Sequence, residues 1–329
     1  MGIQVGVAGT GRLGKEHVRV LKSLPEVDRV ACFDIDHDKS ISVADAYGAE
    51  AVTSLDELFD QVDVVSIVAP TKDHAAIALA ALAHGKDLFI EKPIAATVAE
   101  AEAVVAAAGE AGRIVQIGHV ERFNPAFEAS RSLIVSPSFM EIERLSAFTL
   151  RGTDVSVVMD LMIHDLDLVL LIVGEWPREI RAKGAGILTE GPDIVNVRLE
   201  FPGGCVANVT ASRVSMEASR KFRIFSPSHY ISIDLKERRI KYFKKSDQFY
   251  AKLAAIQSAG AGGGHLDLAE FLDTDEFTVT GEEPLKTELQ SFCTAITQRS
   301  RPLVSGEDGL RVLKLATEIL TAMMVEPIP

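Results

Sequence analysis

Lys92 is the residue of this sequence whose type and position point most clearly to chemistry. It belongs to the triplet Glu91-Lys92-Pro93, which follows the short, mostly apolar segment 87–90, a pattern typical of a buried strand. Proline lacks a backbone N–H and holds the preceding residue in extended rather than helical backbone. In an open parallel sheet, ligands bind beyond the carboxyl ends of the strands. We therefore expect the Lys92 ammonium to lie in a ligand-binding crevice.

A second group of polar side chains, Asp160 and His164, interrupts the apolar, helix-like stretch 157–167. Residues four apart lie on one face of a helix, about one turn apart. Unpaired polar groups on a buried face cost free energy, so these two need a reason to be there. One interpretation is a core histidine that pairs with a carboxylate. The other is a general base oriented by its acidic neighbour, because the unperturbed histidine pKa of about 6.5 suits proton transfer near neutral pH.

The segment Gly9-Thr10-Gly11-Arg12-Leu13-Gly14 matches a dinucleotide-binding fingerprint, and it follows a predicted strand at 3–8. Its glycines allow a tight turn, close approach of a pyrophosphate and close packing of the next helix. Asp34 ends the next predicted strand, where a carboxylate can accept hydrogen bonds from the adenosine ribose. No arginine directly follows Asp34 to bind a 2′-phosphate. We therefore predict that NAD, rather than NADP, binds here, and that Lys92 and His164 converge on a substrate hydroxyl beside it.

The first part of the chain alternates apolar segments with alanine-rich ones, which predicts a doubly wound parallel sheet. Thr97 and Glu100 have the spacing of a capping box before one of the helices, for which Gly109 and Gly112 suit the end. We predict an NAD-binding Rossmann domain at residues 1–120. Its strands are expected at 3–8, 29–34, 62–68, 87–90 and 113–117.

From about Asn124 onward the pattern changes to alternating apolar and polar residues, which predicts an antiparallel meander. Its strands are expected within 193–212, on both sides of the turn at 202–204, and at 221–225, 230–235 and 239–243. We predict an α+β domain at 121–329 with a large, open, mostly antiparallel sheet, which binds substrate and carries the oligomer contacts. Its closing helices, 286–298 and 309–324, could also pack on the first domain. The polar sheet face, with Asn196 and Arg198, suggests a homodimer or homotetramer.

Composition limits the class of protein. The 329 residues carry a formal net charge of −13, which disfavours nucleic acids and acidic membrane surfaces as partners. No apolar run reaches the roughly 18 residues of a membrane span, and the start lacks the pattern of a signal peptide, so we expect a cytoplasmic protein. The three cysteines are far apart without ligand spacing, so neither a metal site nor a disulfide is predicted.

Together these residues resemble the glucose-fructose oxidoreductase / inositol dehydrogenase (Gfo/Idh/MocA) family over nearly the whole chain. The family joins a Rossmann domain to an open antiparallel sheet domain. Its Glu-Lys-Pro motif corresponds to Glu91-Lys92-Pro93, and its Asp-x-x-x-His pair to Asp160 and His164. The resemblance implies that Lys92, Asp160 and His164 are catalytic and contact the substrate.

Further positions follow from the same resemblance. The segment 68–71 with His74 is similar to the family's nicotinamide-side loop, which implies that Pro70, Thr71 and His74 contact the cofactor, as do Glu91 and Lys92. The motifs at 118–125, 160–167 and 211–215 look like a branch of the family that oxidises the 3-hydroxyl of UDP-N-acetylglucosamine to a ketone for lipid A or other glycans.

That narrower resemblance implies a nucleotide-sugar substrate, with Arg122, Asn124 and Arg213 as substrate-binding residues. The two arginines would supply positive charge for a diphosphate in an acidic protein, although salt bridges explain them equally well. Another family dehydrogenase, acting on a free sugar, inositol or a uronic-acid nucleotide sugar, is an alternative. A non-catalytic NAD-binding sensor is a second alternative.

Overall fold

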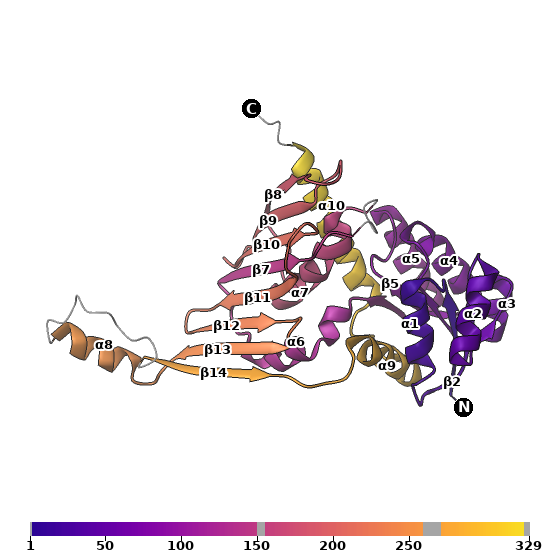
Figure 1. Ribbon diagram of the computed structural model, residues 1–329, viewed down its shortest axis with the longest axis horizontal. Coiled ribbons are helices and arrows are strands. Elements are labelled where there is room, and N and C mark those ends of the chain that lie inside the picture. The colour runs from indigo at the N-terminus through magenta and orange to yellow at the C-terminus, as the bar shows by residue number, and fades with distance from the viewer. Residues whose placement is uncertain (1, 150–154, 259–270, 326–329) are drawn as a thin grey trace. The chain divides into compact units, whose positions relative to one another are not determined.

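The computed structural model describes residues 2–149, 155–258 and 271–325. The chain forms two compact units (Figure 1). The first comprises Met1–Phe123 and Glu282–Glu318, and the second comprises Asn124–Gly281 and Ile319–Pro329.

The first unit contains a six-stranded parallel sheet with the order β3-β2-β1-β4-β5-β6. Its strands are β1 (Ile3–Ala8), β2 (Val27–Phe33), β3 (Glu50–Ala51), β4 (Val64–Ile67), β5 (Asp87–Glu91) and β6 (Val115–Gly118). Its helices are α1 (Arg12–Leu21), α2 (His37–Tyr47), α3 (Leu55–Gln61), α4 (Thr71–Ala83), α5 (Val98–Ala111), the short 3-10 helix η1 (Val120–Phe123), α9 (Pro284–Gln298) and the first part of α10 (Gly306–Val325). The predicted doubly wound sheet is confirmed, and only the two-residue edge strand β3 was not predicted.

Helices cover both faces of this sheet because every crossover between parallel strands is expected to be right-handed. Helices α1, α2 and α9 bury apolar side chains in one cluster with β1 and β2, which includes Val18, Val43 and Phe292. The reversal of strand order after β1 sends α3, α4 and α5 to the opposite face. The predicted capping box is confirmed, since Glu100 N–H donates to Thr97 Oγ1 at 3.2 Å and Thr97 N–H donates to the Glu100 carboxylate at 3.0 Å.

The second unit is built on an eight-stranded sheet with the order β14-β13-β12-β11-β7-β10-β9-β8 (Figure 1). Its strands are β7 (Phe139–Leu145), β8 (Glu179–Ala185), β9 (Ile194–Glu200), β10 (Val206–Ser212), β11 (Ser219–Phe225), β12 (His229–Asp234), β13 (Arg239–Lys245) and β14 (Leu272–Thr278). Its remaining helices include α6 (Pro125–Ser130), η2 (Arg131–Leu133), α7 (Ile163–Val173) and α8 (Phe249–Ser258).

The expected antiparallel meander is confirmed for β11, β12 and β13, but the whole sheet contains strands that were not predicted. Strand β7, which was not predicted, inserts between β10 and β11 and pairs with β10 in parallel. The sheet is therefore mostly antiparallel, as expected. Strands β8 to β10 and β11 to β14 each follow chain order, and β7 interrupts it. Strands β8 and β14 were also not predicted, since neither has the clear apolar alternation of β9.

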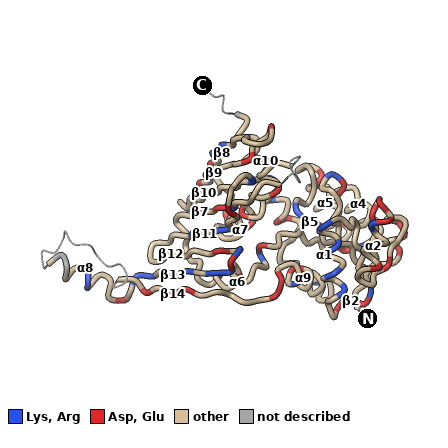
Figure 2. Tube along the Cα trace, in the orientation of Figure 1, with Lys and Arg blue, Asp and Glu red and all other residues tan. Residues whose placement is uncertain are grey.

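Alternation along the strands gives this sheet an apolar face and a polar one. Val195, Val197 and Leu199 of β9 are fully buried, whereas Asn196 between them is exposed. Charged side chains pair across the polar strands: Lys241 of β13 lies 2.9 Å from Glu276 of the edge strand β14. Figure 2 shows the basic residues of β13 beside the acidic residues of β14. Charge on an edge strand disfavours unwanted pairing with other strands.

The stretch 157–167 is not the single α-helix that residue spacing predicted. Residues Val158–Met162 form a π-helix (η3), and α7 continues from Ile163 to Val173 before it ends at Gly174 in left-handed conformation. A π-helical turn contains one more residue than an α-helical turn and is often found at functional sites. The apolar pattern of a π-turn and an α-turn is nearly the same over so few residues, so sequence spacing could not distinguish them.

Three general features bear on the class of protein. Cys32, Cys205 and Cys293 are buried free thiols. Within the ranges that the structure describes, no cluster of three metal-ligating side chains occurs, and no helix is both long enough and apolar enough to cross a membrane.

Candidate active site and cofactor site

The glycine fingerprint forms the turn between β1 and α1 at the carboxyl edge of the sheet. Gly9 has φ of 98°, and a Cβ there would lie 2.7 Å from Ala69 N. A Cβ on Gly14 would lie 1.9 Å from the Gly9 carbonyl oxygen, so both positions require glycine. A Cβ on Gly11 would meet nothing within 4 Å, and Gly11 caps α1 without a side-chain hydrogen bond. The helix N-terminus therefore faces open space, which fits a pyrophosphate.

Asp34 follows β2 and turns toward the glycine loop. Its Oδ2 accepts hydrogen bonds from Thr10 N–H at 2.7 Å and Thr10 Oγ1 at 3.1 Å, while Oδ1 accepts from Asp36 N–H at 3.0 Å. A carboxylate has about four acceptor positions, so Asp34 can still accept from a ribose hydroxyl. Thr10 is buried, and it orients Asp34. The neighbouring Ile35 is 94% exposed, so an apolar side chain lies open beside Asp34.

The predicted nicotinamide-side loop joins β4 to α4. Pro70 caps α4, and Thr71 is its first residue. His74 is buried, with Nε2 at 2.8 Å from the Ala69 carbonyl oxygen and Nδ1 at 2.9 Å from the Pro93 carbonyl oxygen. His74 thus links this loop to the Glu-Lys-Pro turn after β5, and both of its ring nitrogens are engaged with the protein backbone.

Lys92 follows Glu91, the last residue of β5, at the same edge of the sheet as the glycine loop. Lys92 is half-buried, whereas Glu91 is buried. The Glu91 carboxylate lies 3.1 Å from His17 Nε2 of α1 and accepts the Lys92 backbone N–H at 3.1 Å. Burial would raise the pKa of Glu91, but the hydrogen bond and charge of His17 and the charge of Lys92 lower it below its ordinary value. Glu91 is therefore ionised at neutral pH.

Asp160 and His164 lie in the second unit, on the π-helix and on the first turn of α7. Both side chains are half-buried, so neither is fully enclosed in the core. The next residue, Asp165, is fully buried and forms a two-point ion pair with Arg144 of β7, at 2.8 Å from Nε and 2.7 Å from Nη2. This pair attaches the helix turn that contains His164 to β7, a central strand of the sheet.

Arg122 and Asn124, which were predicted to bind substrate, are both buried in the structure. Arg122 donates to the Leu303 carbonyl oxygen at 3.1 Å and lies 3.6 Å from Asp308. Asn124 caps α6 by accepting the Ala126 N–H at 3.0 Å, and it donates to the Leu235 carbonyl oxygen at 3.0 Å. Each therefore makes structural contacts within its own unit.

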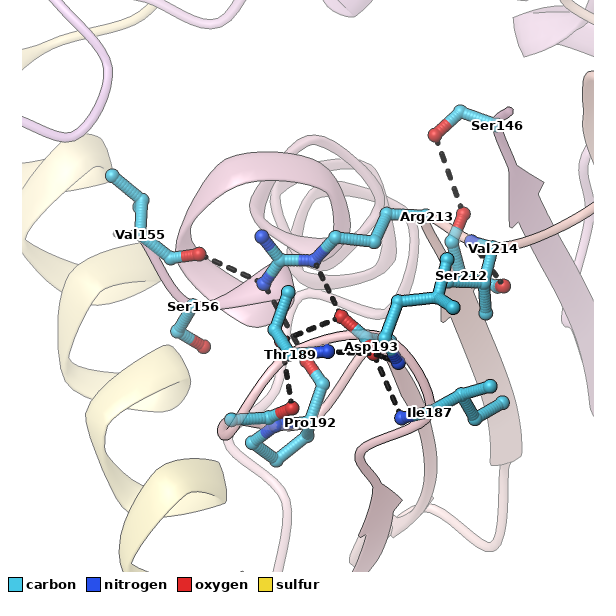
Figure 3. A network of polar contacts seen from close by, with 12 residues as sticks. Ser146, Val155, Ser156, Ile187, Thr189, Pro192, Asp193, Ser212, Arg213 and Val214 are labelled. Carbon is cyan, nitrogen blue, oxygen red and sulfur yellow. Dashed lines mark hydrogen bonds and ion pairs between the residues drawn. The ribbon is translucent and has the colours of Figure 1, made fainter. Parts of the chain in front are cut away.

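Arg213 also makes extensive contacts (Figure 3). Its Nη2 donates to the Val155 carbonyl oxygen at 2.8 Å, just before the π-helix, and its Nε lies 3.6 Å from Asp193. Asp193 accepts the backbone N–H groups of residues 187–189 at 2.6 to 3.0 Å. Burial would raise the pKa of Asp193, but these hydrogen bonds hold it well below its ordinary value. Arg213 and Asp193 thus connect the loop 187–193 to the start of the π-helical segment.

The structure therefore brings the predicted cofactor residues together at one edge of the first sheet, while Asp160, His164, Asn124 and Arg213 belong to the second unit. Three buried residues that support the site were not predicted: His17 contacts Glu91, Asp193 contacts Arg213, and Arg144 contacts Asp165, the neighbour of His164. A histidine inside an otherwise apolar helix face was the signal available for His17. Nothing in the local sequence indicated that Arg144 and Asp193 would support the site.

Comparisons with known proteins agree with this geometry. Residues 3–119 match a family of oxidoreductases with an NAD-binding Rossmann fold (GFO/IDH/MocA), and residues 101–227 match the C-terminal domain of the same family. The chain is 32% identical over 322 residues to UDP-N-acetylglucosamine 3-dehydrogenase from Acidithiobacillus ferrooxidans, covering 98% of this chain and 97% of that protein. It is 25% identical to inositol 2-dehydrogenase from Rhizobium meliloti, covering 96% and 95%.

Solved structures of two dehydrogenases have the same fold as this chain. A crystal form of the Acidithiobacillus ferrooxidans enzyme superposes with a TM-score of 0.89 at 31% identity, covering 99% of this chain and all of that one. Levoglucosan dehydrogenase in complex with NADH shares the fold, with a TM-score of 0.86 at 18% identity over 98% and 97% of the two chains. This chain thus belongs to the GFO/IDH/MocA family and is an NAD-dependent oxidoreductase that acts on CH–OH groups.

Proposed function

We propose that this enzyme oxidises the 3-hydroxyl of UDP-N-acetylglucosamine to a ketone with NAD. The observation that carries the proposal is the full-length similarity, in sequence and in fold, to a UDP-N-acetylglucosamine 3-dehydrogenase. Relatives with other substrates, such as inositol 2-dehydrogenase, are also similar over nearly their whole length but at lower identity.

The residues of this chain suit the proton part of the reaction. Bound NAD would supply the hydride acceptor for the carbinol carbon. We assign the hydroxyl proton to His164, whose imidazole is a general base suited to neutral pH, and assign its orientation to Asp160. Lys92 donates a hydrogen bond to the same oxygen and stabilises the negative charge that develops there.

In this proposal the first unit holds the cofactor and contributes Lys92 and Arg122 to substrate binding, and the second unit contributes the other substrate-binding residues. Arg122 and Arg213 remain candidates for the diphosphate, but a phosphate would share them with the carbonyl and carboxylate groups that they already contact. Their guanidinium groups could do so because each carries five N–H donors.

The test is a panel of UDP-sugars, free sugars and inositol, with NADH formation followed by absorbance and the product identified by mass spectrometry. We expect turnover of UDP-N-acetylglucosamine and a product oxidised at C3. Turnover confined to free sugars or inositol would overturn the nucleotide-sugar assignment. Binding of NAD without turnover of any sugar would favour the sensor alternative.

Variants test the assigned roles. Lys92→Met and His164→Asn should each lower kcat by about 100-fold or more while NAD still binds. Asp160→Asn should cause a smaller loss, because it disturbs orientation and leaves the base in place. Unchanged kcat in Lys92→Met and His164→Asn would contradict these roles.

We also propose that the enzyme is a homodimer or homotetramer through the second sheet. Aromatic residues lie side by side across its strands, with ring centroids of Phe225 and Tyr230 4.7 Å apart and those of Tyr230 and Phe243 5.4 Å apart. They line a cavity of about 510 Å³ together with Leu272. Light scattering should show an oligomer that Phe243→Glu weakens, and a monomeric native protein would refute this proposal.

A further inference from the structure

The residues on both sides of Lys92 are held by buried histidines from two different helices. On one side, His17 of α1 contacts the carboxylate of Glu91 at 3.1 Å. On the other side, His74 of α4 contacts the Pro93 carbonyl oxygen at 2.9 Å. Both imidazoles are buried, with exposed fractions of 0% and 1%. The two helices are themselves packed on opposite faces of the same sheet, so the turn at Lys92 is anchored from both faces.

Both oxygens of the Glu91 carboxylate contact groups of the protein. One oxygen contacts His17, and the other accepts the backbone N–H of Lys92. His17 is fixed in turn by Ser66 of β4, whose Oγ lies 2.9 Å from Nδ1, and by edge-to-face packing on Phe89. An ionised carboxylate is costly to bury unless such contacts compensate it. The free-energy cost of burying the Glu91 carboxylate therefore implies that it serves a purpose at the turn that contains Lys92.

The space for this carboxylate is created by a glycine on the neighbouring strand. Gly118 of β6 pairs with Glu91, and a Cβ on Gly118 would lie 2.9 Å from the carboxylate carbon and both oxygens. Any larger residue at position 118 would have to displace Glu91. Four elements of the first unit, α1, β4, β5 and β6, therefore define the position of one carboxylate that contacts the backbone of Lys92.

We propose that His17 and His74 are positioning residues for Lys92, and that Glu91 and the Pro93 carbonyl transmit their effect. Glu91 then acts on the backbone of Lys92 instead of binding the cofactor directly. Fixing the backbone on both sides of a reactive lysine restricts the ammonium to a small volume, and displacements near 1 Å can cost about 100-fold in rate. This inference rests on the proposed role of Lys92 in the reaction.

The experiment compares Glu91→Gln, Glu91→Ala, His17→Leu and Gly118→Ala. For each, kcat and KM with the best sugar substrate are measured, together with the Kd for NAD by fluorescence. Gln keeps an acceptor for the Lys92 N–H, so kcat in Glu91→Gln should stay within about 10-fold of the native enzyme, whereas Glu91→Ala and His17→Leu should lose about 100-fold. The Kd for NAD should change by less than about threefold in all four.

Gly118→Ala tests the same contact without touching the carboxylate, and we expect a loss of kcat between those of the Gln and Ala variants. Gly109→Ala is the matched control, because a Cβ there would meet nothing within 4 Å and the residue lies within α5. It should leave kcat unchanged. Weaker NAD binding with native kcat in Glu91→Ala would overturn the proposal and make Glu91 a cofactor ligand.

The Lys92→Met variant separates this inference from the proposed function. If Lys92→Met is inactive but Glu91→Ala and His17→Leu keep native kcat, only the positioning role fails. If Lys92→Met itself keeps native kcat, the proposed role of Lys92 fails and the positioning role fails with it. Thermal denaturation reports the stability of each variant. If Glu91→Gln loses as much kcat as Glu91→Ala, the role of Glu91 is merely structural.

Discussion

The ion pair between Arg144 and Asp165 is the contact whose loss should be most damaging to the second unit. It joins the inner face of β7 to α7, and the two side chains are only 4% and 1% exposed. Asp165→Leu would leave the Arg144 guanidinium buried without this carboxylate. Removing one partner of a buried pair typically costs about 3–5 kcal/mol, whereas replacing both with apolar residues is often close to neutral. We therefore expect Arg144→Met/Asp165→Leu to be more stable than Asp165→Leu alone.

Calorimetry can measure the loss of stability in these variants. Each kcal/mol shifts the Tm of a domain of 150–250 residues by about 2–4 °C, so the single variants should lose about 6–20 °C. Because His164 precedes Asp165 on the same helix turn, kcat should fall in the single variants at temperatures where they are still folded. A double-mutant cycle isolates the coupling between the two residues. Single variants that lose less than about 1 kcal/mol, or a double variant no better than the worse single one, would refute this reasoning.

Three further outcomes follow from the contacts. Thr97→Ala should destabilise the protein by about 1 kcal/mol through loss of the α5 cap, and Thr97→Ser should restore most of it, as urea denaturation can show. Because the folded-state pKa of Asp193 is depressed, its stabilisation is present above its unfolded pKa of about 3.9 and is lost as the pH falls. The difference in urea midpoint between native protein and Asp193→Asn should therefore shrink below about pH 5, and a constant difference would contradict this. Burial raises the thiol pKa values of Cys32 and Cys205 to about 11 and that of Cys293 to about 12, so alkylation at pH 8 should label them only after unfolding.

Much of the candidate site could be predicted because its signals are local. Gly14 must be glycine because the Gly9 carbonyl lies only five residues earlier in the same turn, and the capping box of α5 spans four residues. Asp34 and Lys92 were placed correctly at the carboxyl edge because each directly follows a strand of a parallel sheet. Their partners could not be predicted in the same way: Glu91 contacts a histidine 74 residues earlier in the chain.

By itself, the sequence determined the spacing of apolar residues in each segment, and this spacing determined the two kinds of sheet and the apolar face of β9. It also determined the glycine loop. Only the tertiary structure decided that β7 lies in parallel beside β10, that residues 158–162 adopt a π-helix, and that Arg213 is bound to the Val155 carbonyl. The physical reason is the range of the interactions. Backbone conformation and side-chain periodicity act over a few residues, whereas strand order and the partners of buried charges depend on which distant segments pack together.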